Sequence, residues 1–167
     1  MTSSNGLLQK LADKDRDADE DPGFKLIVAF DYYDGPESGL ALYPSGEGVY
    51  FTSLGDSKTR LFRAFELMPI EGEWWSRVSE VWRTVGPGTP ERVFVVPEST
   101  QAVEGFEREV RDAAQTGQFV AVGGLSLETL SARAIAPEEL KTLRDVSSRT
   151  SGFQLAYRMV KGREPGD

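Results

Sequence analysis

The first part of the chain contains short runs rich in apolar residues, many of them β-branched or aromatic. These runs cover residues 24–33, 40–43, 49–54 and 60–67. Short sequences typical of turns separate them, such as Asp34-Gly35-Pro36 after the first run. Four strands joined by short turns predict an antiparallel β-meander.

After residue 70, apolar residues recur every three or four positions, which is the spacing of an amphipathic helix. Residues 71–85 and 99–116 show this pattern, and Pro137 opens a third helix because acidic residues fill the turn after it. Short apolar runs at residues 92–96, 119–122 and 153–160 predict single strands. Residues 125–135 fit a strand or a helix, so their structure stays open.

Strands come first, and helices interleaved with single strands follow. This order predicts an α+β fold in which helices pack on one face of a mostly antiparallel sheet. A length of 167 residues suffices for one core, so we expect a single domain over residues 24–162. Six of the nine residues from Asp13 to Asp21 are acidic. Residues 1–23 are therefore predicted to be a disordered acidic leader, and residues 163–167 a flexible tail.

The chain has no histidine and no cysteine. The commonest general base, the commonest nucleophilic thiol and the commonest zinc ligands are thus missing. Its glycine clusters lack the spacing of phosphate or dinucleotide loops, and no Ser-x-x-Lys pair occurs. We expect no catalytic residue, no metal and no cofactor on these grounds.

The charge balance is acidic, with 19 basic and 27 acidic residues and a formal net charge of −8. Such a protein repels nucleic acid and attracts a basic partner protein. No apolar run approaches the roughly 18 residues of a membrane span, and the first residues do not resemble a secretion signal, so we expect a soluble cytoplasmic protein. The basic residues near the C-terminus are predicted to be solvated surface: Arg144, Arg149, Arg158, Lys161 and Arg163.

The most distinctive local feature is an acidic and aromatic turn from Asp31 to Gly39. Its predicted binding residues are Asp31, Tyr32, Tyr33, Asp34 and Glu37. Trp75 joins them because it lies off the buried stripe of its predicted helix. The same turn also has a purely structural interpretation, in which Asp34 caps the turn and the glycines supply positive dihedral angles.

Two functions fit this turn. The preferred hypothesis is a non-enzymatic interaction module that binds a basic partner, in the manner of immunity proteins that neutralise basic toxins. The alternative is a carboxylate-based enzyme, or a site for a small ligand or divalent cation, since hard cations take oxygen ligands. A weaker hypothesis places the contact in the acidic segment 13–21. The oligomeric state is not predicted.

Overall fold

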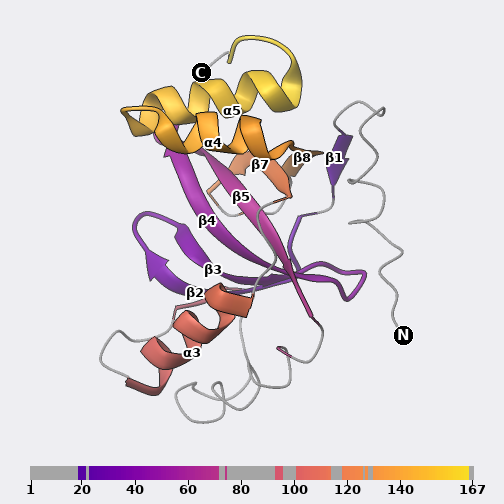
Figure 1. Ribbon diagram of the computed structural model, residues 1–167, viewed down its shortest axis with the longest axis vertical. Helices are drawn as coiled ribbons and strands as arrows, with labels where there is room; N and C mark the ends of the chain where they lie inside the picture. The colour runs from indigo at the N-terminus through magenta and orange to yellow at the C-terminus, as the bar shows by residue number, and fades with distance from the viewer. Residues whose placement is uncertain are drawn as a thin grey trace.

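An eight-stranded sheet and three helices make up the part of the chain that the computed structural model describes (Figure 1). The described residues are 19–21, 23–71, 74, 93–95, 101–113, 118–125, 127 and 130–165. The fold is α+β, as the sequence predicts. No helix among the described residues is long and apolar enough to cross a membrane.

The strands form one continuous sheet. In chain order they are β1 (Asp19–Asp21), β2 (Leu26–Tyr32), β3 (Pro36–Leu42), β4 (Gly48–Asp56), β5 (Phe62–Ile70), β6 (Val93–Val95), β7 (Phe119–Gly124) and β8 (Leu130–Ala134). Their order in the sheet is β1-β8-β7-β5-β4-β3-β2-β6. All neighbours are antiparallel except β2 and β6, which are parallel. The predicted meander is present as β2 to β5, each strand pairing with the next.

The helices are α3 (Gln101–Ala113), α4 (Pro137–Asp145) and α5 (Arg149–Lys161). Helix α4 starts at its predicted proline, and the Ala136 amide donates to Glu139 Oε1 at 3.0 Å. Helices α4 and α5 contact each other, and α5 covers β4, β5 and β7 (Figure 1). Helix α3 lies away from α4 and α5, next to β2 in Figure 1.

The predicted strand at residues 153–160 is wrong, because these residues belong to α5. The run alternates in polarity, but Phe153 and Val160 are buried at helical spacing against the sheet. The ends of the segment also carry helix signals. The Ser148 hydroxyl accepts a hydrogen bond from the Ser151 amide at 3.1 Å, and Gly162 ends the helix with a φ of 74°.

Two further predictions are changed or decided by the structure. Residues 19–21 of the predicted disordered leader form β1, because the outer edge of β8 offers unpaired backbone groups. Residues 125–135, for which the sequence did not decide between strand and helix, contain a strand, β8. Residues 1–18 and 22 of the leader lie outside the described residues. So does the predicted helix 71–85, which contains Trp75, apart from residues 71 and 74.

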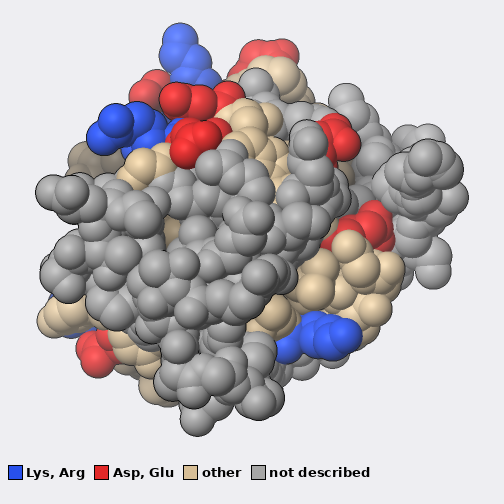
Figure 2. Space-filling model, turned by 90° about the horizontal axis from the view of Figure 1, so that it is seen from below, with Lys and Arg blue, Asp and Glu red and all other residues tan. Residues whose placement is uncertain are grey.

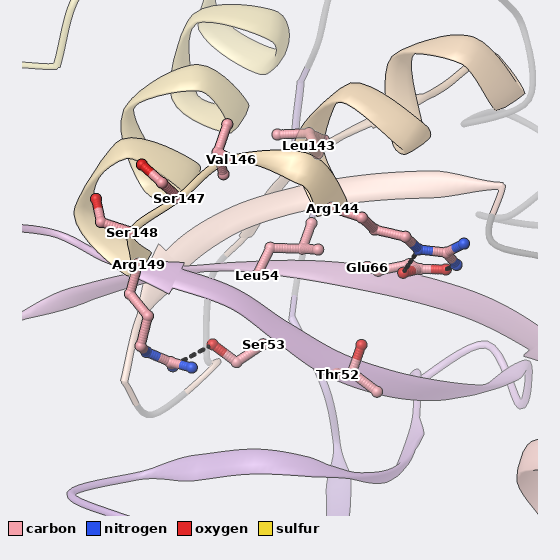
Figure 3. A pocket seen from close by; sticks show the side chains of 10 residues that line it. All are labelled: Thr52, Ser53, Leu54, Glu66, Leu143, Arg144, Val146, Ser147, Ser148 and Arg149. Carbon is pink, nitrogen blue, oxygen red and sulfur yellow. Dashed lines mark hydrogen bonds and ion pairs between the residues drawn. The ribbon is translucent and has the colours of Figure 1, made fainter.

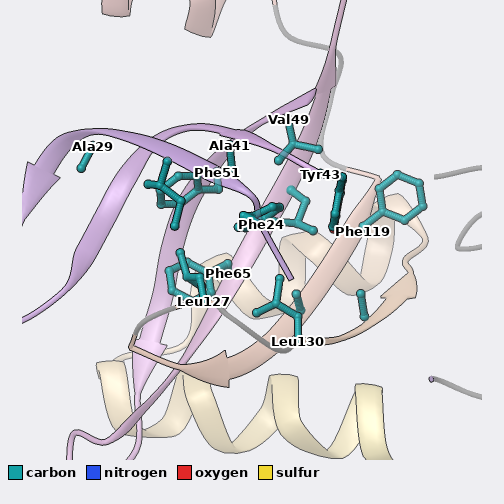
Figure 4. Packing of buried hydrophobic residues seen from close by; sticks show 14 residues of the cluster. Phe24, Ala29, Ala41, Tyr43, Val49, Phe51, Phe65, Phe119, Leu127 and Leu130 are labelled. Carbon is teal, nitrogen blue, oxygen red and sulfur yellow. The ribbon is translucent and has the colours of Figure 1, made fainter. Parts of the chain in front are cut away.

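The larger core is aromatic and lies on the inner face of a curled sheet (Figure 4). The Phe24 ring lies 4.8 Å from that of Tyr43, and the Phe51 ring lies 5.7 Å from that of Phe65. The Phe24 amide donates to the Leu127 carbonyl at 3.1 Å. Because this bond joins the segments before β2 and β8, which lie five strands apart in the sheet, the sheet must curl.

A second core fills the space between the sheet and the C-terminal helices. Its members include Leu140 and Leu143 of α4, Phe153 of α5, and Val120 and Val122 of β7. Full burial of each large apolar side chain is worth about 1.5–3 kcal/mol. This core fixes the start of α5 against β4, where the candidate site lies.

Candidate functional site

A buried arginine holds the turn between β2 and β3 from beneath. The Arg63 side chain of β5 is only 3% exposed. Its guanidinium donates to the Pro36 carbonyl at 3.1 Å and also to the Tyr33 carbonyl. Asp34 and Gly35 have φ angles of 53° and 129°, so the turn needs residues that tolerate the left-handed region. The turn is thus anchored to β5 rather than projecting freely.

Arg63 belongs to a set of four charged side chains that we call the ion cluster: Glu37, Asp56, Arg63 and Arg149. Arg63 Nε lies 2.8 Å from Asp56 Oδ1, and Arg63 Nη2 lies 3.5 Å from Glu37 Oε2. Arg149 contacts the same two carboxylates, at 2.9 Å for Glu37 and 3.1 Å for Asp56. Two positive and two negative charges balance, as a buried guanidinium requires.

The ion cluster lowers the pKa of the Asp56 carboxyl group. Burial by itself would raise its pKa, but hydrogen bonds from Arg149 and Arg63 outweigh burial and hold the pKa below the usual value of an aspartate. The same hydrogen bond to Asp56 raises the pKa of Arg149. Both partners therefore stay charged at neutral pH.

The structure separates the residues predicted as one binding turn. Asp31, Tyr32, Tyr33 and Asp34 are exposed, whereas Glu37 lies in the ion cluster. Trp75 lies outside the described residues. Among the described residues, no group of three or more acidic side chains is placed to hold a metal ion.

Large apolar side chains are exposed at two turns. Among the described residues they are Tyr32 at 49%, Tyr33 at 63%, Leu61 at 61% and Phe62 at 45%. We call these four residues the turn patch. Tyr32 is the last residue of β2 and Tyr33 begins the β2–β3 turn, whereas Leu61 ends the β4–β5 turn and Phe62 is the first residue of β5. Arg63 follows Phe62 directly and bonds the Tyr33 carbonyl, so the two turns lie at the same end of the sheet.

Sequence reasoning missed Leu61 and Phe62. The signal was available, because successive strand residues point to opposite faces and two apolar residues in a row cannot both enter one core. The β7–β8 connection also reaches this end of the sheet. A Cβ atom added to Gly35 would lie 3.1 Å from Leu125 Cβ and 3.2 Å from Arg63 Nη1.

A smaller polar group lies between α3 and β4. Tyr50 is buried there, and its hydroxyl is hydrogen-bonded to Arg111, which pairs with Glu107 at 3.5 Å. Burial, and then the charge of Glu107, raises the pKa of Tyr50. Burial also raises the pKa of Glu107, and the charge of Asp31 adds to this effect. This end of α3 therefore lies close to the acidic part of the β2–β3 turn.

A pocket of about 380 Å³ opens between β4 and the junction of α4 with α5 (Figure 3). Arg144 and Arg149 line it, and both are about half exposed. Arg144 binds the buried Glu66 through two hydrogen bonds, of 2.6 and 3.3 Å. Two of the five basic residues predicted as solvated surface are therefore hydrogen-bonded to carboxylates, and a third, Arg158, pairs with Glu164 at 3.6 Å.

No known relative was found. Comparison with protein-family models, with curated proteins and with solved structures gave no match. A function for this chain therefore has to be argued from its turns, its ion cluster and its pocket.

Proposed function

We propose that this protein is a non-enzymatic interaction module that binds a basic partner protein through the turn patch. One observation carries the proposal: among the residues whose side-chain burial the structure describes, every exposed large apolar side chain lies at one of two turns, and Arg63 bonds the first turn from the strand that follows the second. A contiguous apolar patch at the surface of a soluble protein usually marks a binding site, and the two turns lie at the same end of the sheet. Tyrosine and other aromatic residues are also enriched in protein interfaces.

The hydrogen bonds that Arg63 makes to the β2–β3 turn favour binding at the turn patch. Arg63 bonds two carbonyls of the β2–β3 turn and is itself fixed by Asp56. A turn held in this way loses little conformational entropy when a partner binds. The structural and functional interpretations of the turn are therefore compatible, since Glu37 supports the turn while the tyrosines face solvent.

The charge of the molecule favours a basic partner. Asp31 and Asp34 are exposed on the β2–β3 turn, and the whole chain has a formal net charge of −8. Lys58 and Arg60 are exposed on the β4–β5 turn, so the charge beside the turn patch is mixed. Figure 2 likewise shows acidic and basic side chains next to each other at the edge of one face. The long-range attraction would come from the net charge and would fall with salt.

The alternative of a carboxylate site at this turn gains no support. Glu37 is paired with two arginines, and among the described residues no group of three or more carboxylates is placed to hold a metal ion. We therefore do not propose a cation-binding or catalytic role for the turn.

A comparative capture from lysate of the native host tests the proposal. The baits are the wild-type protein, Tyr33→Ser, Leu61→Ser and a control, Arg158→Ser, whose side chain is exposed on α5. We expect a basic protein that is retained by the wild type and by the control and lost from both patch variants. Equal retention by all four baits, or empty captures throughout, would contradict the proposal.

A further inference from the structure

The turn patch and the charged residues beside it fall into two halves of opposite charge. Residues 31–34, which we call the acidic half, consist of two aspartates and two tyrosines. Residues 58–62, which we call the basic half, contain a lysine and an arginine together with the leucine and phenylalanine of the patch. Every residue of both halves is exposed. Each half therefore presents apolar side chains together with charges of a single sign.

A third connection joins the two halves. A Cβ atom added to Gly35, the residue after the acidic half, would lie 3.1 Å from Leu125 Cβ. One added to Gly124 would lie 4.0 Å from the Leu61 carbonyl oxygen of the basic half. Leu125 is itself half-buried. Residues 124 and 125 thus contact both halves, and the bond from Arg63 to the acidic half keeps the halves at one end of the sheet.

This end of the sheet is locally neutral. The acidic half has two acidic residues, the basic half has two basic residues, and the ion cluster has two of each. The formal net charge of −8 therefore belongs to the rest of the chain. At physiological salt, exposed charges more than about 8 Å apart are largely screened. The net charge thus does little to keep two copies from meeting at this end.

Arg60 has a backbone conformation that favours other residue types. Its φ angle is 62°, in the left-handed region where glycine and asparagine are preferred. Its amide donates to the Ser57 carbonyl at 3.0 Å, which closes the turn. Residues held in such conformations cluster at functional sites. An arginine here is therefore explained by its side chain, which is exposed next to Leu61, rather than by the needs of the turn.

We propose that two copies of the chain pair through these halves about a two-fold axis. An axis that passes between the halves sets the acidic half of each copy against the basic half of the other. The aspartates then meet Lys58 and Arg60, and the tyrosines cover Leu61 and Phe62. This inference rests in part on the proposed function, because pairing covers the surface proposed to bind the basic partner. Self-pairing would therefore limit the access of that partner.

Sedimentation equilibrium of the purified full chain tests the pairing. Two turns form a small interface, so we expect a monomer–dimer equilibrium with a dissociation constant of about 0.1 mM at physiological salt. A concentration series from about 10 µM to about 1 mM covers this range. The mass of a single chain throughout the series would overturn the proposal.

Arg60→Gly separates pairing from folding. Glycine relieves the backbone at this position, so thermal stability in dilute solution should be equal to or above that of the wild type. Pairing should nevertheless weaken about fivefold or more, because the side chain that meets the aspartates is lost. A dissociation constant equal to that of the wild type would contradict the role of Arg60.

A charge exchange tests the arrangement of the halves. Arg60→Glu and Asp34→Lys should each pair about tenfold more weakly alone, whereas an equimolar mixture should regain the wild-type affinity. Arg60 already shows that a long basic side chain fits the left-handed backbone that Asp34 shares. Both variants keep a negative net charge, so net charge does not draw them together. A mixture that pairs no better than its components would overturn the two-fold arrangement.

Arg158→Glu is the matched control, because it makes the same charge change at an exposed position of α5. It should pair like the wild type, and an equal loss in this control would contradict the proposal.

Arg60→Glu also distinguishes this inference from the proposed function. The substitution makes the patch more acidic, so the variant should lose self-pairing and still retain the basic partner in the lysate capture. Self-pairing without capture of a partner would overturn the proposed function alone. Capture of a partner by a chain that stays monomeric would overturn the inference alone.

Discussion

Arg63 is the residue on which the candidate site depends. Its guanidinium is buried, yet it pairs with the carboxylates of Asp56 and Glu37. It also bonds two backbone carbonyls of a turn about 30 residues earlier in the chain. The alternation of β5 already places Arg63 on the same face as Phe65 and Leu67, which are core residues. The sequence thus indicates an inward-facing arginine, but it does not show which groups would bond it.

Replacing Arg63 with methionine should therefore be costly. Arg63→Met leaves the Tyr33 and Pro36 carbonyls without their donor and removes one cation from the ion cluster. We expect the free energy of unfolding to fall by about 3–5 kcal/mol, as when one partner of a buried ion pair is removed. Chemical denaturation measures this change. The matched Arg158→Met, at an exposed pair with Glu164, should change stability by less than about 0.5 kcal/mol. Similar losses in both variants would argue against a special role for Arg63.

Asp56 should make part of the stability depend on pH. Its pKa is lowered in the folded protein, so ionised Asp56 stabilises the fold above the pKa of an unfolded aspartate, about 3.9. This contribution is lost as the pH falls through the lower, folded pKa. Asp56→Asn should therefore be less stable than the wild type at pH 7, and the gap should narrow below about pH 4. Urea denaturation at pH 7, 5 and 3 measures the gap, and a constant gap would be inconsistent with this assignment.

At the scale of elements, the docking of α5 on β4 depends on very close backbone contact. A Cβ atom added to Gly152 would lie 2.5 Å from the Leu54 carbonyl oxygen, and one added to Gly55 would lie 2.0 Å from the Arg149 carbonyl oxygen. Both distances are shorter than atoms tolerate. The two glycines therefore allow the start of α5 to approach the strand, and this approach brings Arg149 to the ion cluster.

Two glycine substitutions inside helices should have opposite effects. Gly105 of α3 has open space around an added Cβ, so Gly105→Ala should stabilise the protein by about 0.5–1 kcal/mol through helix propensity. Gly152→Ala gains the same propensity but clashes with backbone, and we expect a net loss of about 1–3 kcal/mol. Thermal and chemical denaturation of both variants measure the difference. A gain in stability from Gly152→Ala would show that α5 is not held tightly against β4.

The elements were predictable to different degrees for physical reasons. The meander and α4 follow from β-branched and aromatic composition, turn residues and a proline start, which are local properties of the chain. Helix α5 was misassigned because its apolar residues satisfy both a strand and a helix pattern. Its cap at Ser148 and its terminal Gly162 were the deciding local signals.

At the scale of the whole molecule, the candidate site could be predicted only in part. The acidic and aromatic turn is visible in the sequence, but Glu37 meets Arg149 across a separation of 112 residues. No local pattern indicates that this glutamate supports the turn instead of facing a partner. The same holds for Leu61 and Phe62, because only the bond from Arg63 to the Tyr33 carbonyl shows that they lie at the same end of the sheet as the tyrosines.

The net charge of −8 should act on the rate at which the partner is found. We expect the association rate constant to fall about tenfold or more between 50 and 500 mM salt, while the dissociation rate changes little. Surface-binding kinetics with the captured partner measure both rates. An association rate that does not respond to salt would show that the partner is not attracted by charge.

The affinity of the captured partner for a doubly substituted turn patch tests the central claim most directly. Tyr33→Ser combined with Leu61→Ser removes the two most exposed members of the patch and should leave the fold intact. If the patch is the binding surface, calorimetry should show affinity weakened by about 30-fold or more, with Arg158→Ser unchanged. Equal affinity of the double variant and the wild type would contradict the account and move the binding surface elsewhere on the molecule.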